Sequence, residues 1–414
     1  MRHRPPHPVV TGLGAITPLG PTLTATWQAL VAGRSGVDRL DGVEVHGLPA
    51  LAAGQVRGFR AADHLPAREV HKTDRFIQFA HVAANEALAD AGIDAGAVAA
   101  DRAAVLFGCG RGGLPAVEQA AARYRIRGGR GVSPHFSVLT LANMAAAQIA
   151  RAFGFTGPCL GIATACASGT HAIAEAAHLI RRGEADVVVT GGSEAVITPL
   201  MLAGFHQAKV LATAGEDPPR ACRPFDRYRS GFVLGEGACC LVLEAAAHAR
   251  ARGARIYGEV AGSGMTCDAY HPTTPDPEGR ALARAVTLAL GAADAAPHDL
   301  RYISAHGTGT LHNDPTEARA LHLALGAAAD TVPISSIKGA TGHMLGASGA
   351  LEAAVCLLAM RDGVAPATAN LVHPDPACPL AHIIGAPARG AFPLVLSHSA
   401  GFGGVNAALV LRRQ

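Results

Sequence analysis

A short segment of this chain occurs twice, and the repeat constrains the fold more than any other feature. Residues 167–169 read Ala-Ser-Gly, and Gly183 follows after thirteen further residues. Residues 347–349 repeat Ala-Ser-Gly, and Gly363 follows after the same interval, at an offset of 180 residues. Self-similarity of this kind indicates duplicated structural units. We therefore expect two related halves, each with a helix that begins at small residues and can approach its counterpart closely.

The segments around the repeat support the same division. Each half begins with a strand that runs into glycine, over residues 8–14 and 256–264. Each half then has a helix, a loop and a second strand, over residues 103–107 and 300–304. Strands that alternate with helices indicate an α/β architecture with layered sheets. We place the boundary between the halves near residue 255, which gives an N-terminal half over 1–255 and a C-terminal half over 256–414.

Cys166 stands directly before the first repeated helix, in Thr164-Ala165-Cys166-Ala167-Ser168. Unpaired backbone N–H groups and the positive end of the helix dipole at such a position favour the thiolate, which is the reactive form of cysteine. Free cysteine is also among the most buried residue types. The local pattern therefore fits a nucleophile and a structural cysteine equally well. The second copy has Gly346 at the matching position, so the halves would share a shape and differ in chemistry.

Two of the 20 histidines are distinguished by their context. His306 closes a predicted strand and opens a loop with Thr308 and Thr310, whose hydroxyls can bond a polar substrate. His343 lies just before the second repeated helix, so the duplication predicts that it lies near the start of the Cys166 helix. We interpret both as candidates for proton or hydrogen-bond chemistry.

Lys338 is the one charged side chain in the stretch between Thr331 and Glu352. We expect it to pair with Glu352 on the following helix. Such a pair can be purely structural, since breaking a buried ion pair is costly. It can also place a positive charge that keeps nearby imidazoles neutral.

Residues 401–404, Gly-Phe-Gly-Gly, form a predicted turn between strands over 394–397 and 407–411. Three glycines free the backbone around Phe402. Such a turn can direct N–H groups at a developing oxyanion, with Phe402 as an apolar gate, or it can be a plain hairpin turn.

Composition excludes several function classes. Charged residues make up 16% of the chain and hydrophobic residues 49%, which predicts a large buried subunit interface. The net charge of +3, with no arginine-rich run, gives no indication of nucleic-acid binding. Nine cysteines without C-x-x-C pairs argue against a disulfide framework or a zinc site and indicate a reducing, cytoplasmic location. Residues 1–8 lack the apolar region of a signal peptide, and no segment is a good membrane span.

Taken together, these segments resemble the β-ketoacyl-acyl-carrier-protein synthases, specifically the type II elongating branch of the thiolase superfamily. The resemblance covers nearly the whole chain, and its specificity comes from the order in which the motifs occur. The motifs are 9–14, the Cys166 segment, 223–226, 231–237, 306–310, 338–343 and 401–404. The resemblance implies a five-layered αβαβα thiolase-like fold of duplicated halves, a dimer, and decarboxylating Claisen condensation in fatty acid or polyketide elongation.

The resemblance also implies roles for individual residues. Cys166 would accept an acyl group from acyl carrier protein, and His306 and His343 would stabilise the enolate formed from malonyl-carrier protein. Lys338 and Glu352 would support them, and the N–H groups of Cys166 and Phe402 would hold the tetrahedral oxyanion. Substrate contacts would come from the pantetheine-facing hydroxyls and the acyl tunnel: Thr308, Thr310, Phe205 and Arg111. Carrier-protein contacts would come from Arg68, Lys72 and Lys209, which a solvated basic face would also explain. No metal or bound cofactor is implied, because the substrates travel on phosphopantetheine.

Two positions depart from the family pattern. Arg111 stands where an apolar residue usually closes the acyl tunnel, and a buried guanidinium would need a partner. We hypothesise that the tunnel is short or ends in a polar contact. Ala400 stands where a phenylalanine often precedes the glycine turn, so the turn would open more easily. The 339–340 and 313–315 segments favour a polyketide or aryl-polyene pathway member.

Other functions remain to be distinguished. Residues 108–113 fit the G-x-G-x-x-G pattern of dinucleotide-binding proteins, yet the acid required about 20 residues later is missing. A thiolase would need a second cysteine where this chain has Phe402. A non-catalytic subunit of a polyketide synthase typically lacks the nucleophile, whereas this chain keeps Cys166. The chain could still be the active member of a heterodimer with a related ketosynthase-like subunit, or it could form a homodimer.

Overall fold

The computed structural model describes residues 6–49, 51–94 and 96–414, so the first five residues of the predicted basic N-terminal segment lie outside it. One sheet of ten strands runs through the molecule in the order β11-β10-β14-β15-β9-β1-β8-β6-β4-β5. Its strands in the first half of the chain are β1 (Pro8–Ile16), β4 (Ala103–Gly108), β5 (Cys159–Ile162), β6 (Val187–Glu194) and β8 (Gly237–Ala245). Those in the second half are β9 (Gly258–Cys267), β10 (Tyr302–Ser304), β11 (Ile334–Ser335), β14 (Leu394–Gly401) and β15 (Val405–Arg412).

The sheet consists of two five-stranded parts with the same topology. In the first, β4 is parallel to β5 and β6, and β8 is antiparallel to β6 and β1. In the second, β10 is parallel to β11 and β14, and β15 is antiparallel to β14 and β9. The parts meet through a short pairing of β1 with β9, where Val9 and Val10 face Glu259 and Gly258. This correspondence of strand order and direction confirms the predicted duplication. The proposed boundary at residue 255 lies between α9 (Ala246–Ala251) and β9.

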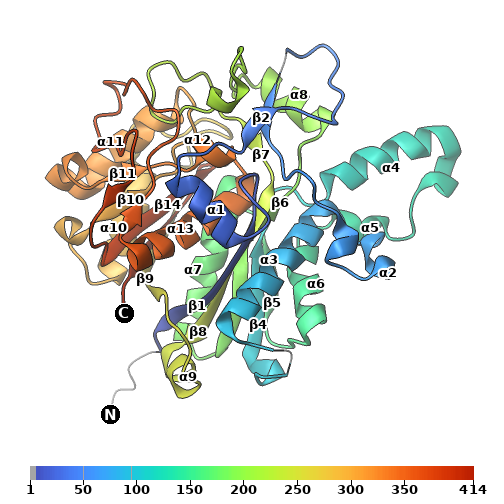
Figure 1. The fold of residues 1–414 in the computed structure, drawn as a ribbon, viewed down its shortest axis with the longest axis horizontal. Helices are drawn as coiled ribbons and strands as arrows, with labels where there is room; N and C mark the ends of the chain where they lie inside the picture. Colours follow the sequence, from blue (N-terminus) through green and yellow to red (C-terminus); the bar gives the residue numbers. More distant parts are fainter. Residues whose placement is uncertain (1–5, 50, 95) are drawn as a thin grey trace.

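Helices complete five layers (Figure 1). Helices α3 (Arg75–Ala91) and α6 (Met144–Phe153) cover the outer face of the first part of the sheet. Helices α10 (Arg280–Ala292) and α11 (Asn313–Leu325) cover the outer face of the second. The repeated helices, α7 (Ser168–Arg181) and α13 (Ser348–Asp362), lie between the two parts and contact both. The α/β class and the layered order predicted from the sequence are confirmed.

The two middle helices approach each other as closely as their small residues allow. A Cβ atom on Gly349 would lie 2.0 Å from Oγ1 of Thr170, and one on Gly169 would lie 2.8 Å from the carbonyl oxygen of Gly346. Thirteen residues of α13 are buried, so this helix is apolar around most of its circumference, as expected for a helix between two sheet faces. The Ala-Ser-Gly repeat therefore brings the two helix starts together at one place in the molecule, the place where Cys166 and His343 also lie.

The remaining elements surround this core. The short strands are β2 (Val37–Arg39), β3 (Ala52–Gly54), β7 (Leu234–Gly235), β12 (Val364–Ala365) and β13 (Ala388–Arg389). The remaining helices are α1 (Leu23–Val31), α2 (Ala67–Val70), α4 (Leu114–Arg127), α5 (Phe136–Thr140), α8 (Pro199–Gln207) and α12 (Lys338–Thr341). Helix α4 projects from the body of the molecule and has no buried residue (Figure 1). None of the helices in the described part of the chain is both long and apolar enough to cross a membrane.

Candidate active site

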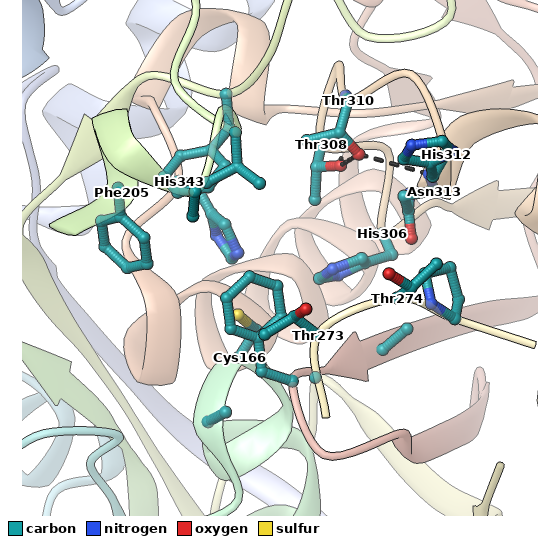
Figure 2. Close-up of a pocket in the computed structure, with 18 of the residues that line it drawn as sticks. Cys166, Phe205, Thr273, Thr274, His306, Thr308, Thr310, His312, Asn313 and His343 are labelled. Atoms are coloured by element: carbon teal, nitrogen blue, oxygen red, sulfur yellow. Dashed lines mark hydrogen bonds between the residues drawn. The ribbon is translucent and has the colours of Figure 1, made fainter. Parts of the chain in front are cut away.

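A cavity of about 360 Å³ lies where the two halves meet, at the starts of the middle helices. Several residues singled out from the sequence line it: Cys166, His306, His343, Phe402, Thr308, Thr310, Phe205, Arg111 and Lys209. Figure 2 shows the His306 and His343 rings directed toward the space above the Cys166 sulfur. Lys338 and Glu352 are buried and do not line the cavity, and Arg68 and Lys72 also lie outside it.

Cys166 lies on a strained turn that leads into α7. Ala165 has a φ of 49°, a left-handed conformation that is uncommon for a residue with a side chain. Its counterpart in the second half, Leu345, has a φ of 45°. Ser168 stabilises the turn, since its hydroxyl accepts a hydrogen bond from the Thr164 N–H at 2.9 Å and donates one to the Ala165 carbonyl at 2.7 Å. Strain retained in this way is characteristic of functional positions.

The protonation state of Cys166 differs from our expectation. Burial raises the pKa of its thiol to about 11, although the Lys338 charge and the Phe402 N–H act in the opposite direction. Cys166 is in a 3-10 turn, Ala165–Ala167, just before α7 begins at Ser168. The prediction of a resting thiolate was therefore wrong. Desolvation outweighs the groups that favour the anion, so the group at rest is a thiol.

The two histidines present neutral rings to the cavity. Their ring centroids lie 5.5 Å apart with planes nearly perpendicular. Burial lowers the pKa of His306 and of His343 well below the usual value, and the Lys338 charge lowers both further. Nδ1 of His343 lies 3.0 Å from the Ser348 hydroxyl, while Nε2 has no partner among the described residues. With Ser348 as the donor, Nε2 carries the proton and is free to donate to a ligand.

Lys338 joins the histidines to the buried polar core. Its ammonium donates to the His306 carbonyl oxygen at 2.5 Å and to the Glu352 carboxylate, and both charged side chains are almost completely buried. Burial raises the pKa of Glu352, and Lys338 opposes that rise. The predicted ion pair is therefore present. Its position behind His306 explains how one cation acts on both imidazoles.

The glycine turn lies between β14 and β15, as predicted. Gly403 and Gly404 have φ values of 89° and 72°, which a residue with a side chain would adopt only with strain. The Phe402 N–H acts on the Cys166 thiol, and the Phe402 ring lies 6.4 Å from that of Phe205. Phe232, which the sequence reading did not single out, packs edge-on against both Phe205 and His343.

Glu194, at the end of β6, is a buried acid that the sequence analysis missed. Its carboxylate accepts hydrogen bonds from the N–H groups of Gly110, Arg111 and Gly346, at 2.8 to 3.1 Å. Burial raises its pKa to about 7. Glu194 thus ties the β4–α4 loop of the first half to the second repeated turn. The sequence did contain a signal for this role, namely an acidic residue at the end of an otherwise uncharged predicted strand.

A second missed group supports the His306 loop. Glu317 accepts a hydrogen bond from the Gly307 N–H at 2.8 Å and pairs with His398 at 2.7 Å. Asp314 accepts from the N–H groups of Phe225 and Gly309. The Thr308 and Thr310 hydroxyls, 3.0 Å apart, lie on this loop and face the cavity (Figure 2). The loop conformation is therefore fixed by two carboxylates on α11.

The basic residues differ from one another in placement. Arg111 lines the cavity, and its side chain is exposed in the single chain, so the described residues do not themselves bury the guanidinium. Lys209, with a φ of 57°, also lines the cavity and is exposed. Arg68 is exposed on α2, and Lys72 follows that helix. The site brings Lys209 to the cavity and leaves Arg68 and Lys72 on the neighbouring surface.

Comparisons with known proteins agree with this geometry. The models of the β-ketoacyl synthase N-terminal and C-terminal domains match residues 8–249 and 257–372. The chain belongs to the β-ketoacyl synthase family. It is 42% identical to 3-oxoacyl-[acyl-carrier-protein] synthase 2 of Coxiella burnetii, over 98% of each chain. It is therefore an acyltransferase, a 3-oxoacyl-acyl-carrier-protein synthase that condenses acyl groups in fatty acid or polyketide elongation.

Solved structures extend the comparison to polyketide synthases. The AntDE:AntF type II polyketide ketosynthase, in complex with its acyl-carrier protein and bound to the hexaketide, superposes with a TM-score of 0.92 at 32% identity. The ishigamide ketosynthase/chain length factor gives the same values. Both matches cover 99% of this chain and 100% of the other. The fold of this β-ketoacyl synthase is thus the thiolase-like ketosynthase fold.

Proposed function

We propose that Cys166 is the nucleophile of this synthase and that it carries the growing acyl group. In the first step its sulfur attacks the thioester of an acyl-carrier protein, which forms acyl-Cys166 and releases the carrier thiol. The observation that carries this proposal is the convergence of Cys166, His306 and His343 on one cavity. A thiol with a pKa of about 11 must lose its proton during attack, and the nearby Lys338 charge and Phe402 N–H lower the cost.

In the second step, malonyl-carrier protein loses carbon dioxide, and its α-carbon attacks the acyl group on Cys166. Electrons from the broken carboxylate bond form an enolate, whose oxygen accepts hydrogen bonds from His306 and His343. The new carbon–carbon bond expels the Cys166 thiolate, which then takes up a proton. Neutral imidazoles suit this step because they donate hydrogen bonds to the enolate oxygen, whereas an imidazolium would be acidic enough to protonate the enolate. The lowered pKa values of both rings support that assignment.

The N–H groups of Cys166 and Phe402 stabilise the tetrahedral oxyanion in both steps. Each hydrogen-bond donor fixed in advance at such a position typically lowers the activation barrier by about 3 kcal/mol. Lys338 and Glu352 keep the imidazoles neutral and hold the His306 backbone. Phe205 and Phe402 line and gate the acyl site, Arg111 contacts the acyl chain, and Thr308 and Thr310 contact the pantetheine arm.

The proposal also includes two binding partners, an acyl-carrier protein and a second subunit. Arg68, Lys72 and Lys209 attract an acidic acyl-carrier protein to the cavity mouth, with Lys209 nearest the cavity. The edge strand β5 supports dimer formation, because it ends the sheet and its Leu160 is 52% exposed. An uncovered edge strand pairs readily with another chain. The nine free cysteines support a reducing, cytoplasmic location.

The partner is a second copy in our main proposal and a related ketosynthase-like subunit in the alternative. The similarity to the ishigamide ketosynthase/chain length factor favours keeping that alternative. Analytical ultracentrifugation of the protein expressed alone distinguishes them. A stable dimer supports the first, and a monomer that becomes dimeric only with a co-expressed subunit supports the second.

Intact-protein mass spectrometry after incubation with an acyl-carrier protein tests the nucleophile. We expect a mass increase of one acyl group in the wild type and none in Cys166→Ala. Cys109→Ala is the matched control, because this buried thiol lies near the site and does not line the cavity. Acylation that persists in Cys166→Ala would refute the assignment.

A further inference from the structure

The loop that connects β4 to α4 presents a single side chain to the catalytic cavity. Its sequence is Cys109-Gly110-Arg111-Gly112-Gly113; Cys109 is buried and does not line the cavity, so Arg111 is the one residue of the loop that presents a side chain to it. The glycines are required by close packing. A Cβ atom on Gly112 would lie 2.5 Å from the Thr140 carbonyl oxygen, and one on Gly113 would lie 1.9 Å from that of Leu139.

The backbone of this loop is fixed next to the nucleophile. The Arg111 N–H donates to the buried Glu194 carboxylate at 3.1 Å, and the Gly110 N–H donates to it at 2.8 Å. A Cβ atom on Gly110 would lie 3.3 Å from the carbonyl oxygen of Ala165, the residue before Cys166. Arg111 is thus a cation on a rigid support beside the thiol, and its charge lowers the pKa of Cys166.

The Arg111 guanidinium forms no ion pair or side-chain hydrogen bond with any residue in 6–49, 51–94 or 96–414. The acid that contacts this loop, the acid that follows it on α4 and the acid that lines the cavity are already engaged. Asp268, in the cavity lining, accepts hydrogen bonds from the Asp276 N–H and the Asn406 side-chain amide. Glu194 binds three backbone N–H groups, and Glu118 accepts a hydrogen bond from the Thr198 hydroxyl. Five N–H donors in a planar fork therefore remain available to a ligand.

One wall of the cavity beside Cys166 is apolar, while the histidines and threonines described above line another part of it. The sulfur belongs to a hydrophobic cluster with Phe205, Phe232 and Leu345, and Phe402 packs against that cluster. Such a wall accepts the methylenes of an acyl chain. It provides no partner for Arg111, so a saturated chain would gain no hydrogen bond from the guanidinium, whereas a chain with an oxygen acceptor would gain one.

We propose that Arg111 selects acyl groups that carry a carboxylate or another oxygen acceptor on the chain. This inference rests on the proposed acylation of Cys166 and adds the class of acyl group to it. A carboxylate at the chain end is the best match, because guanidinium and carboxylate form two parallel charge-assisted hydrogen bonds.

The test compares two acyl groups of equal length on the same carrier protein. One is octanoyl, which ends in a methyl group, and the other is the mono-thioester of octanedioic acid, which ends in a carboxylate. Competitive acylation of Cys166 is followed by intact-protein mass spectrometry, with the protein in the assembly that it forms on purification. The variants are Arg111→Met, which keeps the length and loses the charge, Arg111→Lys, and Arg123→Met. Arg123 is an exposed arginine on α4 that does not line the cavity.

We expect the wild type and Arg123→Met to favour the carboxylate-terminated group at least about tenfold, which corresponds to ~1.4 kcal/mol. Arg111→Met should reverse the preference, and Arg111→Lys should retain part of it. A wild-type preference for octanoyl that Arg111→Met leaves unchanged would overturn this inference while leaving acylation of Cys166 intact. Failure of both groups to acylate Cys166 would refute the nucleophile assignment and the inference with it.

Discussion

Replacing Lys338 with methionine removes one partner of the buried ion pair behind the imidazoles. Lys338 and Glu352 are both fully buried, so the variant leaves a carboxylate in the core without its cation. Removal of one partner from such a pair typically costs ~3–5 kcal/mol. That is a large fraction of the ~5–15 kcal/mol that stabilises most proteins. The double variant Lys338→Met/Glu352→Leu removes both charges, and we expect its free energy of unfolding to lie within ~2 kcal/mol of the wild type.

The cost of Lys338→Met should depend on pH in a defined direction. Burial already raises the pKa of Glu352, and loss of Lys338 raises it further. The folded variant therefore binds a proton at pH values where the unfolded chain has released it. The penalty is absent below the unfolded pKa of Glu352 and grows as the pH rises through the folded pKa. Loss of Lys338 also removes a charge that lowers the pKa values of His306 and His343, so the folded variant accepts protons on these rings more readily. This effect also makes the loss of stability smaller at low pH.

Urea unfolding followed by circular dichroism at pH 5 and pH 8 measures both effects. Lys72→Met is the matched control, since Lys72 is a partly exposed lysine without an ion pair among the described residues. The single variant should lose more stability at pH 8 than at pH 5, and the double variant should lose little at either. Equal losses at the two pH values, or a double variant as unstable as the single one, would refute the reasoning.

Three further predictions follow from the site. Cys166→Gln should abolish condensation yet still release carbon dioxide from malonyl-carrier protein, measured as labelled gas, because both imidazoles remain; loss of both activities in a folded variant would contradict the division of roles. Alkylation of Cys166 by iodoacetamide, resolved from Cys159 and Cys267 by peptide mapping, should keep accelerating from pH 8 to pH 10, because burial raises the pKa of this thiol to about 11; a plateau below pH 8 would show a preformed thiolate. Gly349→Ala should destabilise the protein by ~1–3 kcal/mol in thermal or urea unfolding, because its Cβ would lie 2.0 Å from Oγ1 of Thr170. Gly291→Ala, inside α10 with nothing within 4 Å of the added Cβ, separates this contact from a general glycine effect.

The sequence predicted those features of the site that depend on short segments. Cys166, His306 and His343 each stand beside small residues at the end of a strand or the start of a helix, and such patterns are local. The pairing of Lys338 with Glu352 was predictable because Glu352 was the only nearby acid in an uncharged stretch. The duplication was predictable because both copies kept the same helix length.

Features that depend on distant packing were not predictable from the sequence. The thiolate prediction failed because burial of Cys166 comes from Phe205, Phe232 and Leu345, which lie far away in the sequence. Glu194 and His398 were missed because their roles arise from sheet pairing, which brings strand ends to the core. The position of Arg111 at the surface of the single chain was not predictable, because nothing local indicates that the loop lies at the margin of the chain.

The two strained turns show why only one half of the molecule can be reactive. Gly346 corresponds to Cys166 at the 180-residue offset, and the turns share a left-handed residue at Ala165 and Leu345. A side chain at Gly346 would lie 2.7 Å from the Gly110 nitrogen and 3.0 Å from the Glu194 carboxylate. The space that holds a thiol in one copy is filled in the other by the loop that carries Arg111. A single substitution of Gly346 by cysteine would therefore not create a second nucleophile, because the loop occupies the space that the side chain needs. The two halves differ in the available volume and not only in the identity of one residue.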